Sequence, residues 1–99
     1  MRKAIVTISD DGQALATIVS RELYADIIPL GQVEPQWHDY DAFVFISAMG
    51  ICVRTIAPLL KDKHSDPAVV CMDTAGKNVI AVVSGHVGGA NQLATDVAR

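Results

Sequence analysis

The sequence predicts an α/β fold, a three-layer α/β/α sandwich built on a small, mostly parallel sheet with an antiparallel hairpin at its edge. Two successive units of strand, helix and strand predict parallel strands joined by right-handed crossovers. A short turn then leads into a last strand-like run. Hydrophobic residues make up 51% of the 99 residues, which is enough for a single domain with its own core.

The first unit begins with Ala4–Ile8, a short β-branched run that predicts a buried strand. Ser9–Gly12 predicts a turn and a helix cap. Gln13–Leu23 then predicts a helix, in which these apolar residues are expected to share one face: Leu15, Ile18, Val19 and Leu23. Ala25–Pro29 predicts a second, short strand.

A polar segment links the two units. Leu30–Asp41 contains Gly31 and Pro35, both of which favour a loop over a regular element. Within this loop we expect Trp37 to cover the edge of the sheet, and we assign no role to His38.

The second unit begins with the clearest strand of the sequence, Ala42–Ile46. A helix is expected from about Ile51 to Leu60, with a kink or break at Pro58, because proline lacks the N–H that the helix needs there. Lys61–Asp66 is polar and predicts a loop. Ala68–Met72 predicts the strand that completes this unit.

A hairpin and a final helix are expected after this unit. Asp73–Lys77 predicts a five-residue hairpin loop in which Gly76 supplies a positive φ angle. Asn78–Val83 predicts the returning strand, and Ala90–Arg99 predicts a helix. Because this helical pattern has no capping glycine, we expect residues 1–99 to be a single domain and a fragment of a longer protein.

The composition argues against several classes of protein. The formal net charge of −3 disfavours nucleic acid and membrane surfaces as partners. No apolar run approaches the roughly 20 residues of a membrane span, and no signal-peptide pattern is present, so we expect a cytoplasmic protein. Cys52 and Cys71 both lie in apolar surroundings, which predicts buried free thiols and no metal site in the protein.

The segment Ser84–Asn91 is the strongest candidate site. Three of its residues are glycines that leave backbone N–H groups bare just before a predicted helix: Gly85, Gly88 and Gly89. Bare N–H groups at a helix N-terminus suit an anion, while Ser84 supplies a hydroxyl and His86 a titratable base. A tight turn with a surface histidine explains the same pattern. The glycine spacing matches neither a dinucleotide nor a Walker motif.

Two further segments could contact a ligand. Ser47–Gly50 joins a strand to a helix through small residues, and Arg54 follows one helical turn later. Lys61–His64 adds a local positive charge to an acidic chain. An ordinary turn and a solvated loop are the competing explanations. If the hairpin forms, Lys61–Asp66 lies beside Ser84–Gly89 on one edge of the sheet, and Ser47–Gly50 lies at the other edge.

The order and spacing of several motifs resemble one known family. They are Met49-Gly50-Ile51, Arg54–Lys63, Asp66–Val70, Asp73-x-x-Gly76 and Ser84-Gly85-His86-x-Gly88-Gly89-Ala90-Asn91. The chain resembles the N-terminal domain of cobalamin biosynthesis protein G, the cobalt-precorrin-5A hydrolase family, from about Phe43 to the C-terminus. It departs from the family pattern at Val87, often leucine, and at Cys71, in a strand usually rich in valine.

The resemblance implies a hydrolase of the anaerobic cobalamin pathway, which opens the δ-lactone of cobalt-precorrin-5A with water and releases acetaldehyde. It implies no cofactor, because the substrate itself carries the cobalt. The implied partners are the cobalt-precorrin and the C-terminal remainder of the same protein.

On the chemistry of that substrate we expect His86 and Ser84 to be catalytic, with His86 as the general base. Residues expected to bind the substrate are Gly50, Arg54, Lys61, Gly85, Gly88, Gly89 and Asn91. Two alternatives remain open: a non-catalytic corrinoid-binding or scaffolding module, and a small phosphate-binding α/β module.

Overall fold

The computed structural model describes residues 2–8, 12–62 and 65–83. In these residues a five-stranded sheet has the order β2-β1-β3-β4-β5. The strands are β1 (Lys3–Thr7), β2 (Asp26–Pro29), β3 (Ala42–Ile46), β4 (Ala68–Met72) and β5 (Val79–Val83). The first four run parallel, and β5 pairs antiparallel with β4 at one edge. The predicted fold class is therefore confirmed.

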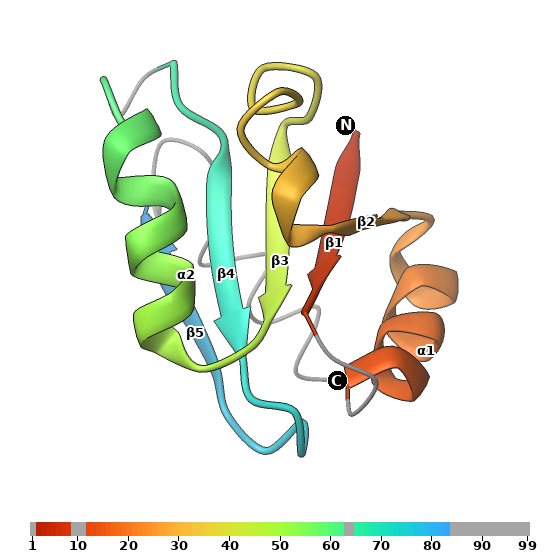
Figure 1. Ribbon diagram of the computed structural model, residues 1–99. Coiled ribbons are helices and arrows are strands. Elements are labelled where there is room, and N and C mark those ends of the chain that lie inside the picture. Colours follow the sequence, from red (N-terminus) through yellow and green to blue (C-terminus); the bar gives the residue numbers. More distant parts are fainter. Residues whose placement is uncertain (1, 9–11, 63–64, 84–99) are drawn as a thin grey trace.

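Helices cover both faces of this sheet (Figure 1). Helix α1 (Gln13–Leu23) packs on one face, while α2 (Met49–Ile56) packs on the other. Side chains of a strand point alternately to its two faces, so Phe43 and Phe45 contact the α2 side and Val44 and Ile46 the α1 side. Each face thus has its own apolar layer, as in other sheets covered on both sides.

Helix α1 has the predicted bounds but not the predicted apolar face. Ala16 and Val19 are buried, and Leu15 and Leu23 pack partly against the same cluster. Ile18, expected on this face, is 59% exposed. At about 100° per residue, Ile18 lies well over a right angle from the centre of the buried stripe, so its inclusion was wrong.

Helix α2 begins and ends earlier than the sequence predicts. It starts at Met49, since Ala48 has the extended backbone of an N-cap residue. It ends at Ile56, and a 3-10 turn, η3 (Ala57–Leu59), follows it. The predicted break at Pro58 is thus confirmed, and Leu60 N–H closes the turn on the Ile56 carbonyl at 3.1 Å.

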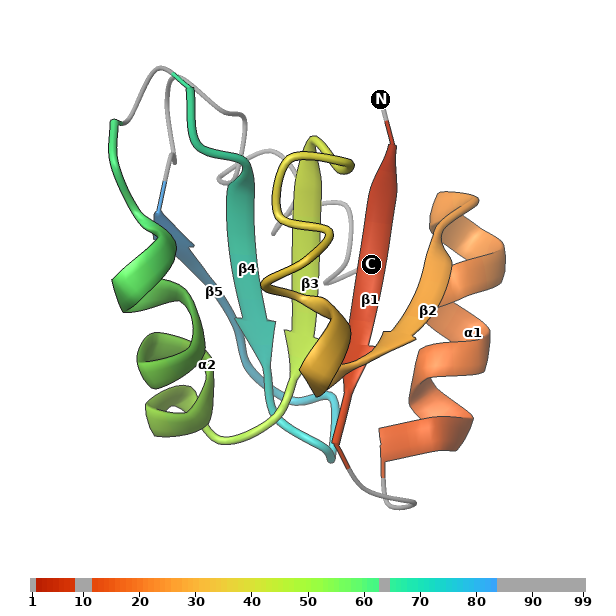
Figure 2. The ribbon, with the colours of Figure 1, turned by 45° about the horizontal axis from the view of Figure 1, so that its top comes forward.

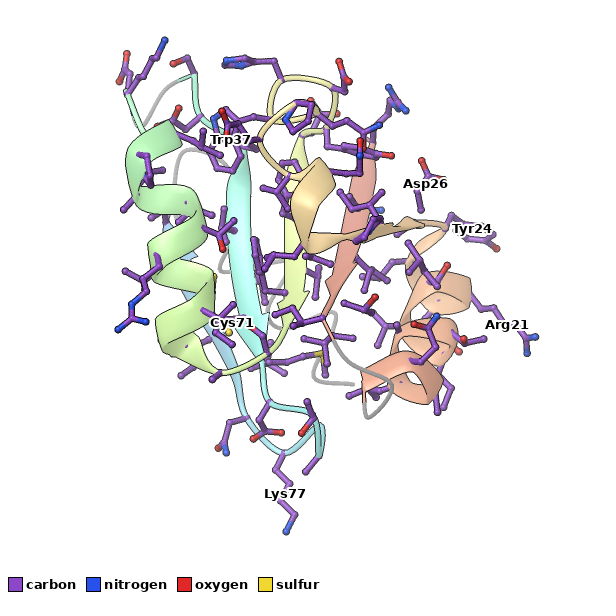
Figure 3. The ribbon with its side chains drawn as sticks, viewed as in Figure 1. Arg21, Tyr24, Asp26, Trp37, Cys71 and Lys77 are labelled. Atoms are coloured by element: carbon purple, nitrogen blue, oxygen red, sulfur yellow. The ribbon has the colours of Figure 1, made fainter. Side chains whose placement is uncertain are left out.

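The segment between β2 and β3 is not simply a surface loop. It starts with a 3-10 turn, η2 (Leu30–Gln32), and it buries Val33, Trp37 and Tyr40. Trp37 stacks on Phe43 in β3, the middle strand, and therefore covers the centre of the sheet. The prediction that it covers the edge of the sheet was wrong. Figures 2 and 3 show this segment lying across the sheet on the α2 side.

The hairpin confirms its predicted turn. Gly76 has a φ of +73°, a conformation that suits glycine, and its N–H donates to the Asp73 carbonyl at 3.0 Å. The register of the β4–β5 pair shifts between Val69 and Val70. The helix predicted at 90–99 lies outside the described residues.

Candidate functional site

The carboxyl ends of β1 and β3 lie side by side, with Thr7 paired to Ile46. From β1 the chain passes through α1 to β2 on one side, whereas from β3 it passes through α2 to β4 on the other. Open α/β sheets bind ligands at such a reversal of strand order, because the two connections diverge there. The geometry therefore assigns the Ser47–Gly50 turn to the usual ligand-binding position of this fold.

Gly12, at the start of α1, lies close to the end of β3. It is buried just before α1, and a Cβ placed on it would lie 3.1 Å from Ile46 Cγ2. A larger residue would push α1 away from the end of β3. The sequence predicted only a turn and a cap here, and Gly12 forms no side-chain cap bond.

Strand β4 holds the Ser47–Gly50 turn in place. Ser47 is buried, and its N–H donates to the Met72 carbonyl at 3.0 Å. The Cys71 thiol donates to the Ser47 carbonyl at 3.5 Å. The Ser47 hydroxyl donates to the Ala48 carbonyl at 2.9 Å, so the hydroxyl is used within the turn.

Gly50 and Arg54 lie on the outer face of α2. They are four residues apart, and both are exposed. A Cβ added to Gly50 would meet nothing within 4 Å, so packing among the described residues does not require glycine there. The N-cap Ala48 has no side chain to accept the first N–H groups of the helix. The start of α2 at Gly50 and the Arg54 guanidinium therefore share one exposed face, which suits an anion.

Lys61 lies at the other end of α2. Its side chain is exposed, and its N–H donates to Asp66 Oδ2 at 2.7 Å. The rest of α2 and the 3-10 turn η3 lie between Gly50 and Lys61, and at a rise of about 1.5–2 Å per residue they hold the two well over 10 Å apart. The structure thus separates Lys61 from the Gly50–Arg54 surface. Neither Arg54 nor Lys61 forms an ion pair with a residue in ranges 2–8, 12–62 and 65–83.

Asp66 organises the turn that carries Lys61, a role that the sequence analysis missed. Its Oδ2 also accepts the Asp62 N–H at 3.0 Å, while its buried Oδ1 has no hydrogen-bond partner among the described residues. The sequence feature that could have indicated this role is the Asp66-Pro67 pair, because aspartate before proline favours a turn. Strand β5 ends at Val83 beside Val69, which places residue 83 at this same end of the sheet.

All of the remaining predicted site residues lie outside the described residues. These are Ser84, Gly85, His86, Gly88, Gly89 and Asn91. Their assignments stay predictions.

The two thiols lie beneath the Ser47–Gly50 turn, and both are buried and free, as predicted. Cys52 lies in α2 and Cys71 in β4 (Figure 3 labels Cys71). The interaction with the Cys71 thiol, and then burial, raise the pKa of Cys52. The interaction with the Cys52 thiol lowers the pKa of Cys71; burial opposes this shift, and the hydrogen bonds to Ser47 reinforce it.

Neither a candidate metal cluster nor a membrane-spanning helix occurs in the described ranges. They contain no group of three or more His, Cys, Asp or Glu side chains that could hold a metal ion. Nor do they contain a helix long and apolar enough to cross a bilayer.

Comparison with known proteins gives consistent matches. Residues 32–99 match the family described as Cobalamin synthesis G N-terminal. The chain is 53% identical over 62 residues to a cobalt-precorrin-5A hydrolase of Priestia megaterium, a match covering 63% of this chain and 17% of that protein. It is 59% identical over 54 residues to the protein of that name from Salmonella typhimurium, covering 54% of this chain and 15% of that protein.

A solved structure has the same fold. It is a cobalamin biosynthesis protein G homologue from Sulfolobus solfataricus, which superposes with a TM-score of 0.89 at 28% identity and covers 97% of this chain and 33% of its own. The chain thus spans about a sixth of the two curated relatives and a third of the solved chain.

Proposed function

The chain belongs to the Cobalamin synthesis G N-terminal family, and from this membership we propose that it is the N-terminal domain of a cobalt-precorrin-5A hydrolase. The observation that carries the proposal is the identity of more than half of the aligned residues to two proteins of that name. The matching fold of the solved homologue supports it. The activity proposed is the opening of a lactone by water with release of acetaldehyde.

The described surface suits such a substrate. A cobalt-precorrin carries many acetate and propionate carboxylates, which need cationic and N–H partners. Arg54 is exposed and forms no ion pair with the described residues, and Gly50 leaves the start of α2 open beside it. We assign Gly50 and Arg54 to one carboxylate of the substrate. Because Lys61 lies at the other end of α2, we assign it to a different carboxylate on this large molecule.

The catalytic assignments concern the glycine-rich segment. In the proposed reaction His86 takes a proton from the attacking water, and the N–H groups of Gly88 and Gly89 hold the oxyanion that forms on the lactone carbonyl. Ser84 assists as a hydroxyl group next to the base. Gly85 and Asn91 contribute to substrate binding. The cobalt stays with the substrate throughout, and no cofactor takes part.

A corrinoid-binding module without its own chemistry is the competing function. The observation that favours it is length, because the chain spans only about a sixth of the two hydrolases it resembles. In that case the reactive groups come from the rest of the enzyme, and this domain only positions the substrate.

An acetaldehyde-release assay separates the two functions. We would assay the 99-residue chain alone, the remainder of the Salmonella typhimurium relative alone, and the two together, all with cobalt-precorrin-5A. Activity only in the mixture, lost when His86 is replaced, supports a catalytic contribution from this domain. Full activity of the remainder alone contradicts it, and absence of corrinoid binding by the chain contradicts both functions.

A further inference from the structure

The outer face of α2 and η3, the side turned away from the sheet, is largely apolar. Between Met49 and Leu60 the only charged side chain is that of Arg54. Three larger apolar side chains are exposed there, Ile51 at 37%, Val53 at 44% and Leu60 at 36%. In Figure 1 no described element lies over this outer face. Because a surface helix normally presents polar residues to solvent, an uncovered apolar face suits a binding partner.

Helix α1, on the other face of the sheet, is more polar on its exposed side. Its exposed residues include four polar or charged ones: Gln13, Thr17, Arg21 and Glu22. In α2 the single hydroxyl side chain, Thr55, donates to the Ile51 carbonyl at 2.8 Å and is thus used within the helix. The outer face of α2 therefore offers a ligand one cation among apolar side chains.

Arg54 lies at the middle of this outer face. At about 100° per residue it points away from the buried side of α2, with Ile51 and Val53 on either side of it. Gly50 lies about one turn before Arg54 and Ala57 about one turn after it, and both are exposed. A Cβ added to Gly50 would meet no described residue within 4 Å. These small residues leave the guanidinium open to a broad, flat molecule.

We propose that the outer face of α2, with Ile51, Val53 and Leu60 around Arg54, binds the macrocycle of the corrinoid substrate; this rests on the proposed function. A cobalt-precorrin combines a broad apolar ring with carboxylates at its periphery. The apolar side chains contact the ring, while Arg54 pairs with one peripheral carboxylate. The charges are complementary, because this guanidinium belongs to a chain of net charge −3 that disfavours a polyanion elsewhere.

The test is isothermal titration calorimetry of the 99-residue chain with two cobalt corrinoids that share one ring. One carries free carboxylates and the other neutral amides. The double variant Ile51→Asn/Val53→Asn should weaken binding of both about tenfold at low and high salt, because apolar contact does not depend on charge. Arg54→Ala should weaken only the carboxylate form. Ile18→Asn, at a 59% exposed position of α1, is the matched control and should leave both affinities unchanged.

A second measurement does not depend on the variants. Amide shifts of the wild-type chain, followed by NMR as the neutral corrinoid is added, should change mainly within Met49–Leu60. Changes concentrated elsewhere would overturn the proposal, as would unaltered affinity of the double variant or equal weakening by Ile18→Asn. Each of these results leaves the proposed function intact. Failure of the wild type to bind either corrinoid would instead contradict the proposed function and the proposal together.

Two other occupants of this face are distinguished by the same samples. If sedimentation equilibrium shows a dimer that the double variant converts to a monomer, the face binds a second copy and the proposal is wrong. If the remainder of the Salmonella typhimurium relative shifts the Met49–Leu60 amides and neither corrinoid does, the face is a domain interface and the proposal is again wrong.

Discussion

The indole of Trp37 lies almost parallel to the phenyl ring of Phe43, with ring centroids 5.2 Å apart and an angle of 13° between the planes. Tyr40 meets the same phenyl ring edge-on at 5.6 Å. The segment that joins the two halves of the sheet therefore contributes an aromatic cluster to the core. Because this cluster sits on the middle strand, it links the first strand–helix–strand unit to the second.

Replacing Trp37 with alanine should destabilise the domain strongly. Loss of a large buried aromatic typically costs about 3–5 kcal/mol, through lost burial and the cavity left behind. Trp37→Phe should cost clearly less, because a ring remains and the Trp37 Nε1, which has no partner among the described residues, is removed. Urea unfolding followed by far-UV circular dichroism measures both. Equal losses for the two variants would show that stacking on Phe43 contributes little.

Asp66 should matter for stability through its backbone contacts. Asp66→Ala leaves the N–H groups of Lys61 and Asp62 without their acceptor, which should cost about 2 kcal/mol. Asp66→Asn keeps one side-chain oxygen in place and should cost less. Glu34→Ala, at an exposed position, serves as the control. If Asp66→Ala unfolds at the same urea concentration as the control, the turn does not depend on this carboxylate.

Much of the fold followed from local patterns in the sequence. Ala42–Ile46 and Ala68–Met72 were predicted with their observed bounds, since both are buried on two faces and read as continuous apolar runs. Gly76 and Pro58 act through their own backbone restrictions, which do not depend on distant residues. Such features can be predicted from single positions.

Apart from the face given to Ile18 and the bounds of α2, the errors concern contacts between residues far apart in the chain. Nothing local distinguishes a Trp37 that covers a sheet edge from one that stacks on Phe43, because the partner is set by strand order. The same holds for Gly12, whose close approach to Ile46 depends on how α1 and β3 meet. The separation of Lys61 from Gly50 required the observed course of α2.

The hairpin should weaken in acid because of Asp73. Hydrogen bonds from the Lys77 N–H and then from the Asn78 amide lower the pKa of Asp73 below its ordinary value of 3.8. A lowered folded pKa means that this stabilisation is present above pH 3.8 and is lost as the pH falls through the folded value. The amide shift of Lys77, followed by NMR from neutral to acid pH, reports it. Asp73→Asn should abolish the transition, and a wild-type midpoint above 3.8 would contradict the sign.

His86 should affect turnover and not binding in the complete enzyme. General-base assistance typically contributes 10²–10⁴-fold, so His86→Ala should lose about that much in kcat while KM changes little. His86→Asn keeps a polar side chain but cannot take the proton at neutral pH, and it should lose a similar amount. Wild-type acetaldehyde release by both variants, with chemistry shown to limit the rate, would make His86 a structural residue. The binding-module function would then be favoured.

Arg54 should contribute a charge-dependent share of corrinoid binding. Its guanidinium is exposed on the outer face of α2, with no ion pair to the described residues that would compete for it. Arg54→Ala should weaken binding of a corrinoid with free carboxylates by roughly tenfold at low salt. Because an exposed contact is screened, the difference from wild type should shrink as salt rises. Isothermal titration calorimetry at two salt concentrations measures both effects.

A second arginine tests whether the effect belongs to the site or to the net charge. Arg21 is exposed in the last turn of α1, which packs on the other face of the sheet. Arg21→Ala removes the same charge, so it should leave the affinity and its salt dependence close to wild type if recognition occurs at the α2 surface. Equal weakening by both variants would indicate general attraction to the domain. If Arg54→Ala does not weaken binding, the carboxylate contact lies elsewhere, because Arg54 is the one cationic residue within Met49–Ile56.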